Sequence, residues 1–246
     1  MRGVMLCYSV ETMDTYVVGV DGCKSGWIIC RYKASAGHVS FDVLPSFCEI
    51  LERENSAEVI AMDVPIGLTE DGSPRHCDLE ARRLLSRPRA SSVFPAPARC
   101  LLSEQSYPNA CVRSLTLRGK GVSKQAFAIY PKIAEVDCRM RPELQTHVFE
   151  VHPEVCFWGI GRSAMHHNKK TREGYDERRR MLADMLPFRF PERRQFRQLG
   201  LSAQPDDVLD AAIAAVTAER ISRGVAERLP HNQEFDNTGL RMEIVY

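Results

Sequence analysis

Tyr16-Val17-Val18-Gly19-Val20-Asp21, followed directly by Gly22-Cys23-Lys24-Ser25-Gly26-Trp27, is the stretch of this sequence that decides the fold. An apolar run of β-forming residues ends on a single carboxylate, and a glycine-bracketed turn then leads into a second apolar run at 27–30. This pattern predicts a β-hairpin, with strands at 16–21 and 27–33, whose first strand carries Asp21 at its C-terminal end.

Val59-Ile60-Ala61-Met62-Asp63 repeats the pattern, because it is another apolar run that ends on an aspartate. Between the two runs we predict a third strand at 39–44 and a short helix at 46–55 with Ser46 as its N-cap. A right-handed helical crossover allows the strand at 58–63 to lie parallel to the first strand and beside it. Asp21 and Asp63 would then be neighbours, although an aspartate before a glycine also simply begins a turn.

The remainder of the chain supplies one more strand and several helices. Strand signals are absent between about 67 and 145, where we predict helices at 76–86, 107–117 and 124–139. A fifth strand is predicted at 147–151, and a late helix at 205–223. The fold class predicted is therefore α/β: a five-stranded mixed sheet in the order 3-2-1-4-5, with flanking helices and a helical insertion at about 67–145.

The predicted helix at 205–223 carries a second acidic pattern. Asp207 and Asp210 stand at i and i+3, so they share one face near the N-terminus of the helix. Asp206 and Asp207 also suit the positive end of a helix as capping residues, whereas Asp210 lies one turn further in. The alanines that follow are small enough to let this helix lie close against a sheet. Carboxylates on two strand ends and this helix would together form a site for a hard cation such as Mg²⁺.

These features together resemble the ribonuclease H-like superfamily, and the late helix resembles that of the RuvC-type Holliday junction resolvases. Six motifs are more specifically similar to the uncharacterised DUF429 family, often described as predicted RNase H-like nucleases, and the resemblance spans roughly 16–223. The motifs are Gly19-Val20-Asp21-Gly22-Cys23-Lys24-x-Gly26-Trp27, Asp63-x-Pro65-Ile66-Gly67-Leu68, Arg75-x-Cys77-Asp78-x-x-Ala81-Arg82, Ser92-Val93-Phe94-Pro95-Ala96-Pro97, Glu150-x-His152-Pro153-Glu154 and Asp207-x-x-Asp210-Ala211.

The resemblance implies a fold and a metal site, but no established substrate. It makes Asp21, Asp63, Asp207 and Asp210 both metal ligands and catalytic residues, with Mg²⁺ or Mn²⁺ as the cofactor. Asp63 stands where the resolvases have a Glu. Glu150 has no clear counterpart there, and is either a fifth catalytic carboxylate or a residue that supports an Arg or Lys. Two metal ions about 4 Å apart would activate a water and stabilise the leaving oxygen of a phosphodiester.

Three basic residues are candidates for substrate binding: Lys24, Arg75 and Arg82. Lys24 follows Asp21 closely enough either to touch a phosphate or to pair with the acidic cluster. The arginines would contact a nucleic-acid backbone, although Arg82 also suits a solvent-exposed position. The restrained segment at 92–97 is either a substrate-gating loop or a plug of the core. His152, which precedes a proline, is either a structural hydrogen-bonding residue or a base.

The net charge of +1 conceals a strong partition along the chain. Residues 75–141 carry 13 Lys and Arg against 5 Asp and Glu, and residues 162–197 carry 11 against 5. The rest of the chain is acidic and includes every candidate carboxylate. An acidic centre between basic segments suits a polyanion held over metal ions, here DNA or RNA, although runs such as Arg178-Arg179-Arg180 also occur on solvated helix faces.

The composition is that of a soluble globular protein, with 44% hydrophobic and 26% charged residues among 246. No apolar run approaches the roughly 20 residues that span a bilayer. Nine cysteines without a CxxC pair indicate neither a zinc ribbon nor a disulfide framework, so we expect a cytoplasmic protein with reduced thiols. We predict a disordered lead-in at 1–15 and a single domain at 16–246.

The leading functional hypothesis is a divalent-metal-dependent nuclease that hydrolyses phosphodiester bonds in nucleic acid. One alternative is an ATP-binding phosphotransferase of the actin or sugar-kinase type, which uses a related sheet. The sequence has one copy of the fold, whereas such proteins usually duplicate it across a longer chain. The other alternative is a non-catalytic nucleic-acid-binding module. The oligomeric state is open, and a homodimer is one possibility.

Overall fold

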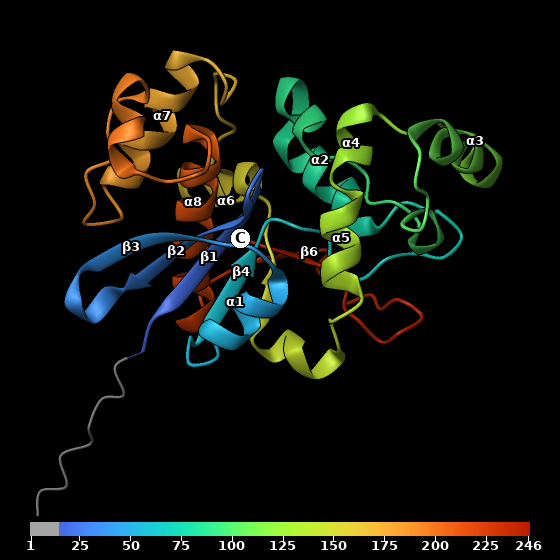
Figure 1. Ribbon diagram of the computed structural model, residues 1–246, viewed down its shortest axis with the longest axis horizontal. Coiled ribbons are helices and arrows are strands. Elements are labelled where there is room, and N and C mark those ends of the chain that lie inside the picture. The colour runs from blue at the N-terminus through green and yellow to red at the C-terminus, as the bar shows by residue number, and fades with distance from the viewer. Residues whose placement is uncertain (1–14) are drawn as a thin grey trace, which may run out of the picture.

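The computed structural model describes residues 15–246, so the predicted lead-in at 1–15 lies outside the described residues apart from Thr15. A five-stranded sheet in the order β3-β2-β1-β4-β5 forms the centre, as predicted (Figure 1). β2 is antiparallel to both β1 and β3, whereas β4 is parallel to both β1 and β5. The strands are β1 Val17–Cys23, β2 Gly26–Lys33, β3 His38–Leu44, β4 Val59–Met62 and β5 Val148–Glu150.

The register of β1 and β4 brings their C-terminal ends to one edge of the sheet. Val20 is the parallel partner of Met62, and the Asp63 backbone N–H donates to the Val20 carbonyl at 2.9 Å. Asp21 therefore lies in β1 directly beside the residue that follows β4. The predicted adjacency of the first and fourth strands is confirmed.

Helices flank the sheet, and those of the insertion lie between β4 and β5 in the chain (Figure 1). No strand interrupts residues 67–145. The helices are α1 Phe47–Arg53, α2 His76–Arg89, α3 Tyr107–Arg118, α4 Lys124–Ala128, α5 Tyr130–Asp137, α6 Pro153–Gly161, α7 Arg172–Ala183 and α8 Pro205–Ser222.

Alternate side chains of the strands build two separate cores, as expected for a sheet covered on both faces. On one face, Ile28, Cys30 and Ala61 pack with α8, α6 and α7. On the other face, Val18, Val20 and Ile60 pack with side chains of α1 and α5. Both faces of the central strands are therefore buried, whereas most residues of the edge strand β3 are partly exposed.

α8 lies unusually close to β1 because neither surface carries bulk at the contact. A Cβ atom placed on Gly19 would lie 2.1 Å from both the Ala211 carbonyl oxygen and the Ala215 nitrogen. No real Cβ makes such a contact, so glycine is required at this position for the helix to sit where it does. The small face of α8 predicted from its alanines is confirmed, and this contact places Asp210 over the end of β1.

The structure differs from the sequence prediction in three places. The helix predicted at 124–139 is two helices, α4 and α5, because Pro131 lacks the N–H that would continue α4 and lies instead in the first turn of α5. α6 begins at Pro153, just after the predicted fifth strand, where no helix was predicted; proline is well suited to the first turn of a helix. The short strands β6 Arg228–Leu229 and β7 Ile244–Val245 were not predicted, since two residues carry no periodicity.

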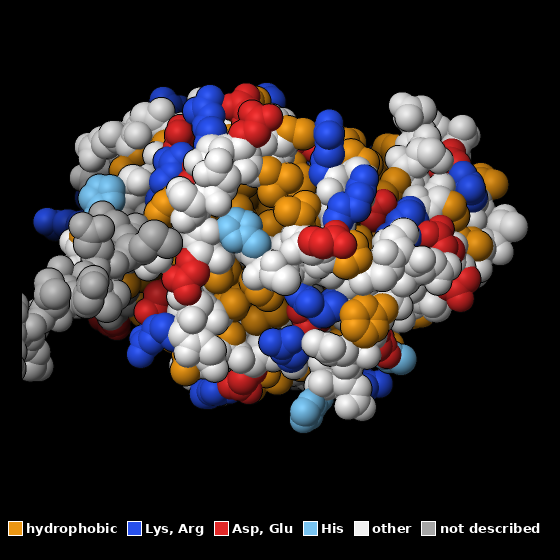
Figure 2. All heavy atoms as spheres, turned by 90° about the horizontal axis from the view of Figure 1, so that it is seen from below, with side chains coloured by type: hydrophobic (Ala, Val, Ile, Leu, Met, Phe, Trp, Pro, Cys, Tyr) orange, Lys and Arg blue, Asp and Glu red, His pale blue; other side chains and the backbone are white. Residues whose placement is uncertain are grey.

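The surface gives no simple picture of the charge partition. On the face drawn in Figure 2, basic, acidic and apolar side chains are interspersed, so the basic segments form no continuous basic field on that face. Among residues 15–246, none of the helices has the length and apolar character needed to cross a membrane.

Candidate metal site

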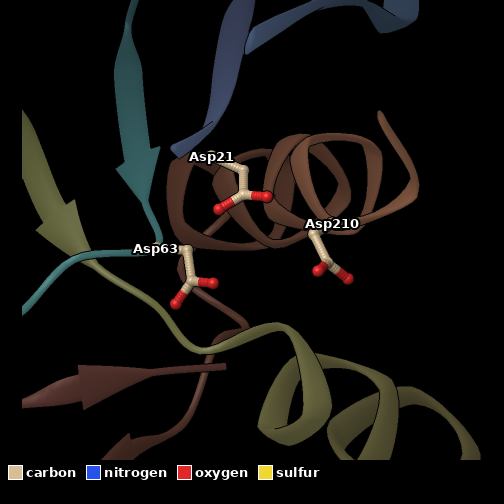
Figure 3. A group of neighbouring side chains, drawn as sticks. All are labelled: Asp21, Asp63 and Asp210. Carbon is tan, nitrogen blue, oxygen red and sulfur yellow. The ribbon is translucent and has the colours of Figure 1, made fainter. Parts of the chain in front are cut away.

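Three aspartates from three different elements converge at the edge of the sheet where β1 and β4 end. Asp21 comes from β1, Asp63 directly follows β4, and Asp210 lies on the second turn of α8 (Figure 3). Each offers a carboxylate oxygen, and these oxygens all lie within 4.8 Å of one another. This spacing fits oxygens that surround a single hard cation.

Burial makes this cluster electrostatically unfavourable in the absence of a cation. Asp21 is 8% exposed and Asp210 is 1% exposed. Desolvation, followed by the charges of Asp63 and Asp210, raises the pKa of Asp21 well above its ordinary value of 3.8. Burial likewise raises the pKa of Asp63, and it raises that of Asp210 to about 6. The cluster therefore binds protons more readily than isolated carboxyl groups do.

Lys169 is the cation that contacts this cluster among the described residues. Its Nζ donates to Asp210 Oδ2, and the carboxylate charges of Asp210 and Asp21 raise the pKa of the ammonium group. Backbone contacts of the two residues before Lys169 fix the position of its segment. Arg178 donates to the His167 carbonyl, and Gly174 leaves room for the Asn168 carbonyl, which a Cβ there would meet at 2.0 Å. The packing of this segment against α7 thus places Lys169 beside the aspartates.

Asp207 lies at the start of α8, beside the cluster but outside the group of three. Its Oδ2 accepts from the Gln204 backbone N–H at 3.0 Å in a capping box, the helix-capping role considered from the sequence. Asp207 also lines the same cleft as Asp21 and Asp63. Desolvation raises its pKa. Its place as a fourth metal ligand stays a prediction.

Glu150 and Arg75 lie together in a buried network away from the three aspartates. Both guanidinium NH groups of Arg75 donate to Glu150, at 2.7 and 2.8 Å, and Arg75 also binds Asp78. Glu150 in addition accepts from the Ile66 N–H at 2.6 Å. Of the two roles considered for Glu150, the structure shows the support of an arginine. Arg75 is 3% exposed and its donors are used internally, so it is not placed to contact a nucleic-acid backbone.

The other two candidate substrate-binding residues lie in different surroundings. Arg82 is half-buried and donates to the Val93 carbonyl at 2.5 Å, which gives it a structural contact on the proline-rich segment. Lys24 is exposed and lines the cleft that contains Asp21. Only Lys24 of the three is therefore both accessible and next to the aspartates.

Two of the three aspartates, Asp21 and Asp63, line a cleft of about 690 Å³. Five basic residues line it: Lys24, Arg89, Lys132, Lys169 and Lys170. Lys132 lies 4.3 Å from the centre of the Trp27 ring and donates to the Gly26 carbonyl at 2.5 Å, so it is fixed to the β1–β2 turn. Four of the five basic residues, all but Lys24, come from the two basic segments, and five acids line the same cleft: Asp21, Asp63, Glu154, Asp206 and Asp207.

Sequence reasoning missed Lys169 and Glu154. Glu154 is 5% exposed, pairs with the buried Arg178 and leaves Oε2 without a hydrogen-bond partner among the described residues. Its negative charge raises the pKa of both Asp63 and Asp210. Glu154 belongs to one of the motifs named above, but the sequence does not show toward which residues its side chain points. Lys169 lies in a polar stretch that has no periodicity.

The fold and the site define an α/β protein with carboxylates clustered at the ends of neighbouring parallel strands, facing a lysine-lined cleft. The chain belongs to the family described as protein of unknown function DUF429, whose model matches residues 19–234. Comparisons with curated proteins and with solved structures gave no match.

Proposed function

We propose that this protein is a divalent-metal-dependent nuclease of the RNase H-like type, which hydrolyses phosphodiester bonds with Mg²⁺ or Mn²⁺. The observation that carries the proposal is the convergence of Asp21, Asp63 and Asp210 within 4.8 Å, with Asp21 and Asp63 lining a cleft that also contains five Lys and Arg residues. Burial of three carboxylates is unfavourable unless a cation balances them. A structure that retains such a cluster at an accessible edge is best explained by the binding of a cation.

The chemistry of the donors fits this group of metals. All three ligands are carboxylate oxygens, which suit Mg²⁺ and Mn²⁺, and no thiol or imidazole belongs to the group of three. Asp21, Asp63 and Asp210 would hold the ion. A cation bound there supplies a nucleophile by lowering the pKa of its water and stabilises charge on a phosphoryl oxygen.

The walls of the cleft supply the complementary binding function. Lys24 and Lys170 are exposed and line the cleft beside the aspartates, where their ammonium groups suit the phosphates of a nucleic-acid strand. Lys169 is 35% exposed in its side chain, so it lies at the boundary between the cluster and the open cleft. Phosphate binding through these lysines would place a backbone over the acids.

The test is metal-dependent cleavage of single-stranded, duplex and branched DNA and RNA, with Mg²⁺, with Mn²⁺ and with a chelator. Asp63→Asn is expected to abolish cleavage while binding stays intact or becomes tighter, because the change removes a ligand and a negative charge. Asp184→Asn, at an exposed position on the surface, is the matched control and should cleave like the wild type.

Two outcomes would defeat the proposal. Cleavage that persists in Asp63→Asn would show a contaminating nuclease. No binding to any nucleic acid at low salt, together with Mg²⁺-dependent binding of ATP, would favour the phosphotransferase instead. For a nuclease, affinity should fall steeply with salt, in proportion to the number of phosphates contacted.

A further inference from the structure

Phe94 is a large aromatic residue that the fold leaves exposed inside the cleft. Its side chain lines the same cleft as Asp21 and Asp63, and the residue is 42% exposed. The neighbouring Val93 is 1% exposed and packs in the core. The chain therefore buries one residue of this pair and holds the other out.

The backbone around Phe94 is held at three successive points. The Ser92 carbonyl accepts from His152 Nε2 at 3.3 Å, and the Val93 carbonyl accepts from Arg82 at 2.5 Å. On the other side, the Ala96 N–H donates to Asp78 Oδ2 at 3.0 Å. Because both flanks are bonded, and two prolines restrain the segment, the position of Phe94 is fixed by its surroundings.

These contacts continue into the buried network around Arg75. Asp78, which holds Ala96, is itself bound by Arg75, and Arg75 is bound to Glu150 at the end of β5. Three of the sequence motifs thus meet here, because Asp78 and Arg82 of one motif and His152 of another bond to the segment at 92–97. What this construction presents to the cleft is an aromatic ring.

We propose that Phe94 is a stacking platform for a nucleobase, and that the substrate of this site is single-stranded nucleic acid. This inference rests on the proposed function. A ring stacks on a base only where the face of that base is free, as it is in a single strand. The cleft volume of about 690 Å³ lies in the range of pockets that enclose one small ligand, which suits a short stretch of one strand.

Other residues that line the cleft support the same substrate. Ile129, at the break between α4 and α5, is 38% exposed and lines the cleft, so a base on Phe94 has further apolar surface nearby. Lys24, Lys132 and Lys170 line the same cleft as these apolar groups and as Asp21 and Asp63. The combination of a basic track with an exposed aromatic ring is the arrangement by which proteins bind single strands without reading their sequence.

The test is a set of binding measurements in the Asp63→Asn background, which removes cleavage. The probes are a short DNA strand, an RNA strand, their duplexes, and an abasic DNA strand that keeps the phosphates and lacks the bases. Phe94→Ala should weaken binding of the base-bearing strands by roughly 5- to 150-fold. Phe94→Trp should restore it, and Phe235→Ala, which removes an exposed phenylalanine outside the cleft, should change nothing.

The outcomes separate this inference from the nuclease proposal. Unchanged affinity of Phe94→Ala for the base-bearing strands, or equal affinity of the parent protein for abasic, duplex and single strands, would overturn the stacking role even if metal-dependent cleavage is found. Phe94-dependent binding without cleavage of any substrate by the wild-type protein would support the stacking role and defeat the nuclease. The DNA and RNA arms show which sugar the cleft accepts.

Discussion

Two buried carboxylate clusters lie at the ends of adjacent strands, and they are built in opposite ways. In one, at the end of β5, Arg75 binds both Asp78 and Glu150 through paired hydrogen bonds. In the other, where β1 and β4 end, three aspartates face one another and Lys169 contacts Asp210. The first cluster has one guanidinium for two carboxylates, whereas the second has one ammonium for three.

The difference separates carboxylates that hold the fold together from those that we propose to hold a cation. Glu150 and Asp78 also accept backbone N–H groups, from Ile66 and Ala96, so their charge is used to hold loops in place. The side chains of the aspartate cluster come together from three elements (Figure 3), and two of them, Asp21 and Asp63, line the cleft. The aspartate cluster, which we call the open cluster, is short of positive charge and borders the cleft, so it has room for an ion. The cluster of Asp78 and Glu150, which we call the closed cluster, is filled by Arg75 and has no such room.

The largest effect is expected where the closed cluster is opened. Arg75→Met leaves two carboxylates buried without their partner, and breaking such a pair costs about 3–5 kcal/mol. The melting temperature should then fall by roughly 6–20 °C, measured by thermal unfolding. Adding Asp78→Asn and Glu150→Gln to this variant should recover part of the loss. If Arg75→Met melts like Arg83→Met, a change at an exposed site, the contrast between the clusters is unfounded.

The metal response of the open cluster is the next effect in size. Mg²⁺ at about 100 times its Kd should stabilise the wild type by about 2.7 kcal/mol, because the ion binds only the folded form. Asp21→Asn should lose most of this gain, whereas Arg75→Met should keep the response at a lower starting temperature. Denaturant unfolding with and without Mg²⁺ measures both. An equal Mg²⁺ response in Asp21→Asn would mean that the ion binds elsewhere.

The pH dependence of metal binding is the third effect in size. The pKa of Asp210 is raised to about 6, so protons compete with the metal as the pH falls below that value. A single group of this pKa lowers the apparent metal affinity about tenfold between pH 7 and pH 5.

The metal-free protein should show the opposite trend. A carboxyl group whose pKa is higher in the folded state stabilises the fold as the pH falls through about 6 toward its unfolded value. Calorimetric titration and thermal unfolding across this range test the two statements, with Asp210→Asn as the control that should reduce both. Burial also raises the pKa of Glu150, to about 7, so part of the stability trend should remain in this variant. A wild-type profile identical to that of Asp210→Asn would rule out this assignment.

The smallest effect is expected from Lys169. Its ammonium group competes with a metal ion for Asp210, so Lys169→Met should bind Mn²⁺ tighter, by about threefold to tenfold, while the metal-free protein becomes less stable. Lys170→Met, which changes an exposed lysine of the same cleft, should shift the metal affinity far less. Weaker Mn²⁺ binding in Lys169→Met would show that the lysine assists the site instead.

The sheet and two of its carboxylates were predictable because their signals are local. An apolar run that ends on Asp21 or Asp63 is visible in consecutive residues, and the right-handed crossover then decides which strands adjoin. Asp210 was predictable for a related reason, since a carboxylate inside a helix beside small residues has few structural uses. In each case the neighbouring residues in the sequence were enough to predict where the carboxylate lies.

The direction in which charged side chains point was not predictable. Arg75 and Lys169 are both basic residues in basic segments, yet one is sealed in the interior and the other contacts the aspartates. The choice depends on partners far along the chain, Glu150 for Arg75 and Asp210 for Lys169. Phe94 illustrates the same limit, because its exposure follows from bonds to its neighbours and not from its own type.

The contact of α8 with Gly19 has a consequence for how this protein can vary. Any side chain at that position would lift the helix from β1, and Asp210 would move away from Asp21 along with it. The absence of a side chain at Gly19 therefore sets the distance between the carboxylates of Asp21 and Asp210. A substitution at Gly19 can therefore abolish cation binding although it changes no acidic residue. Gly19 is as informative about the chemistry of the site as Asp21 is.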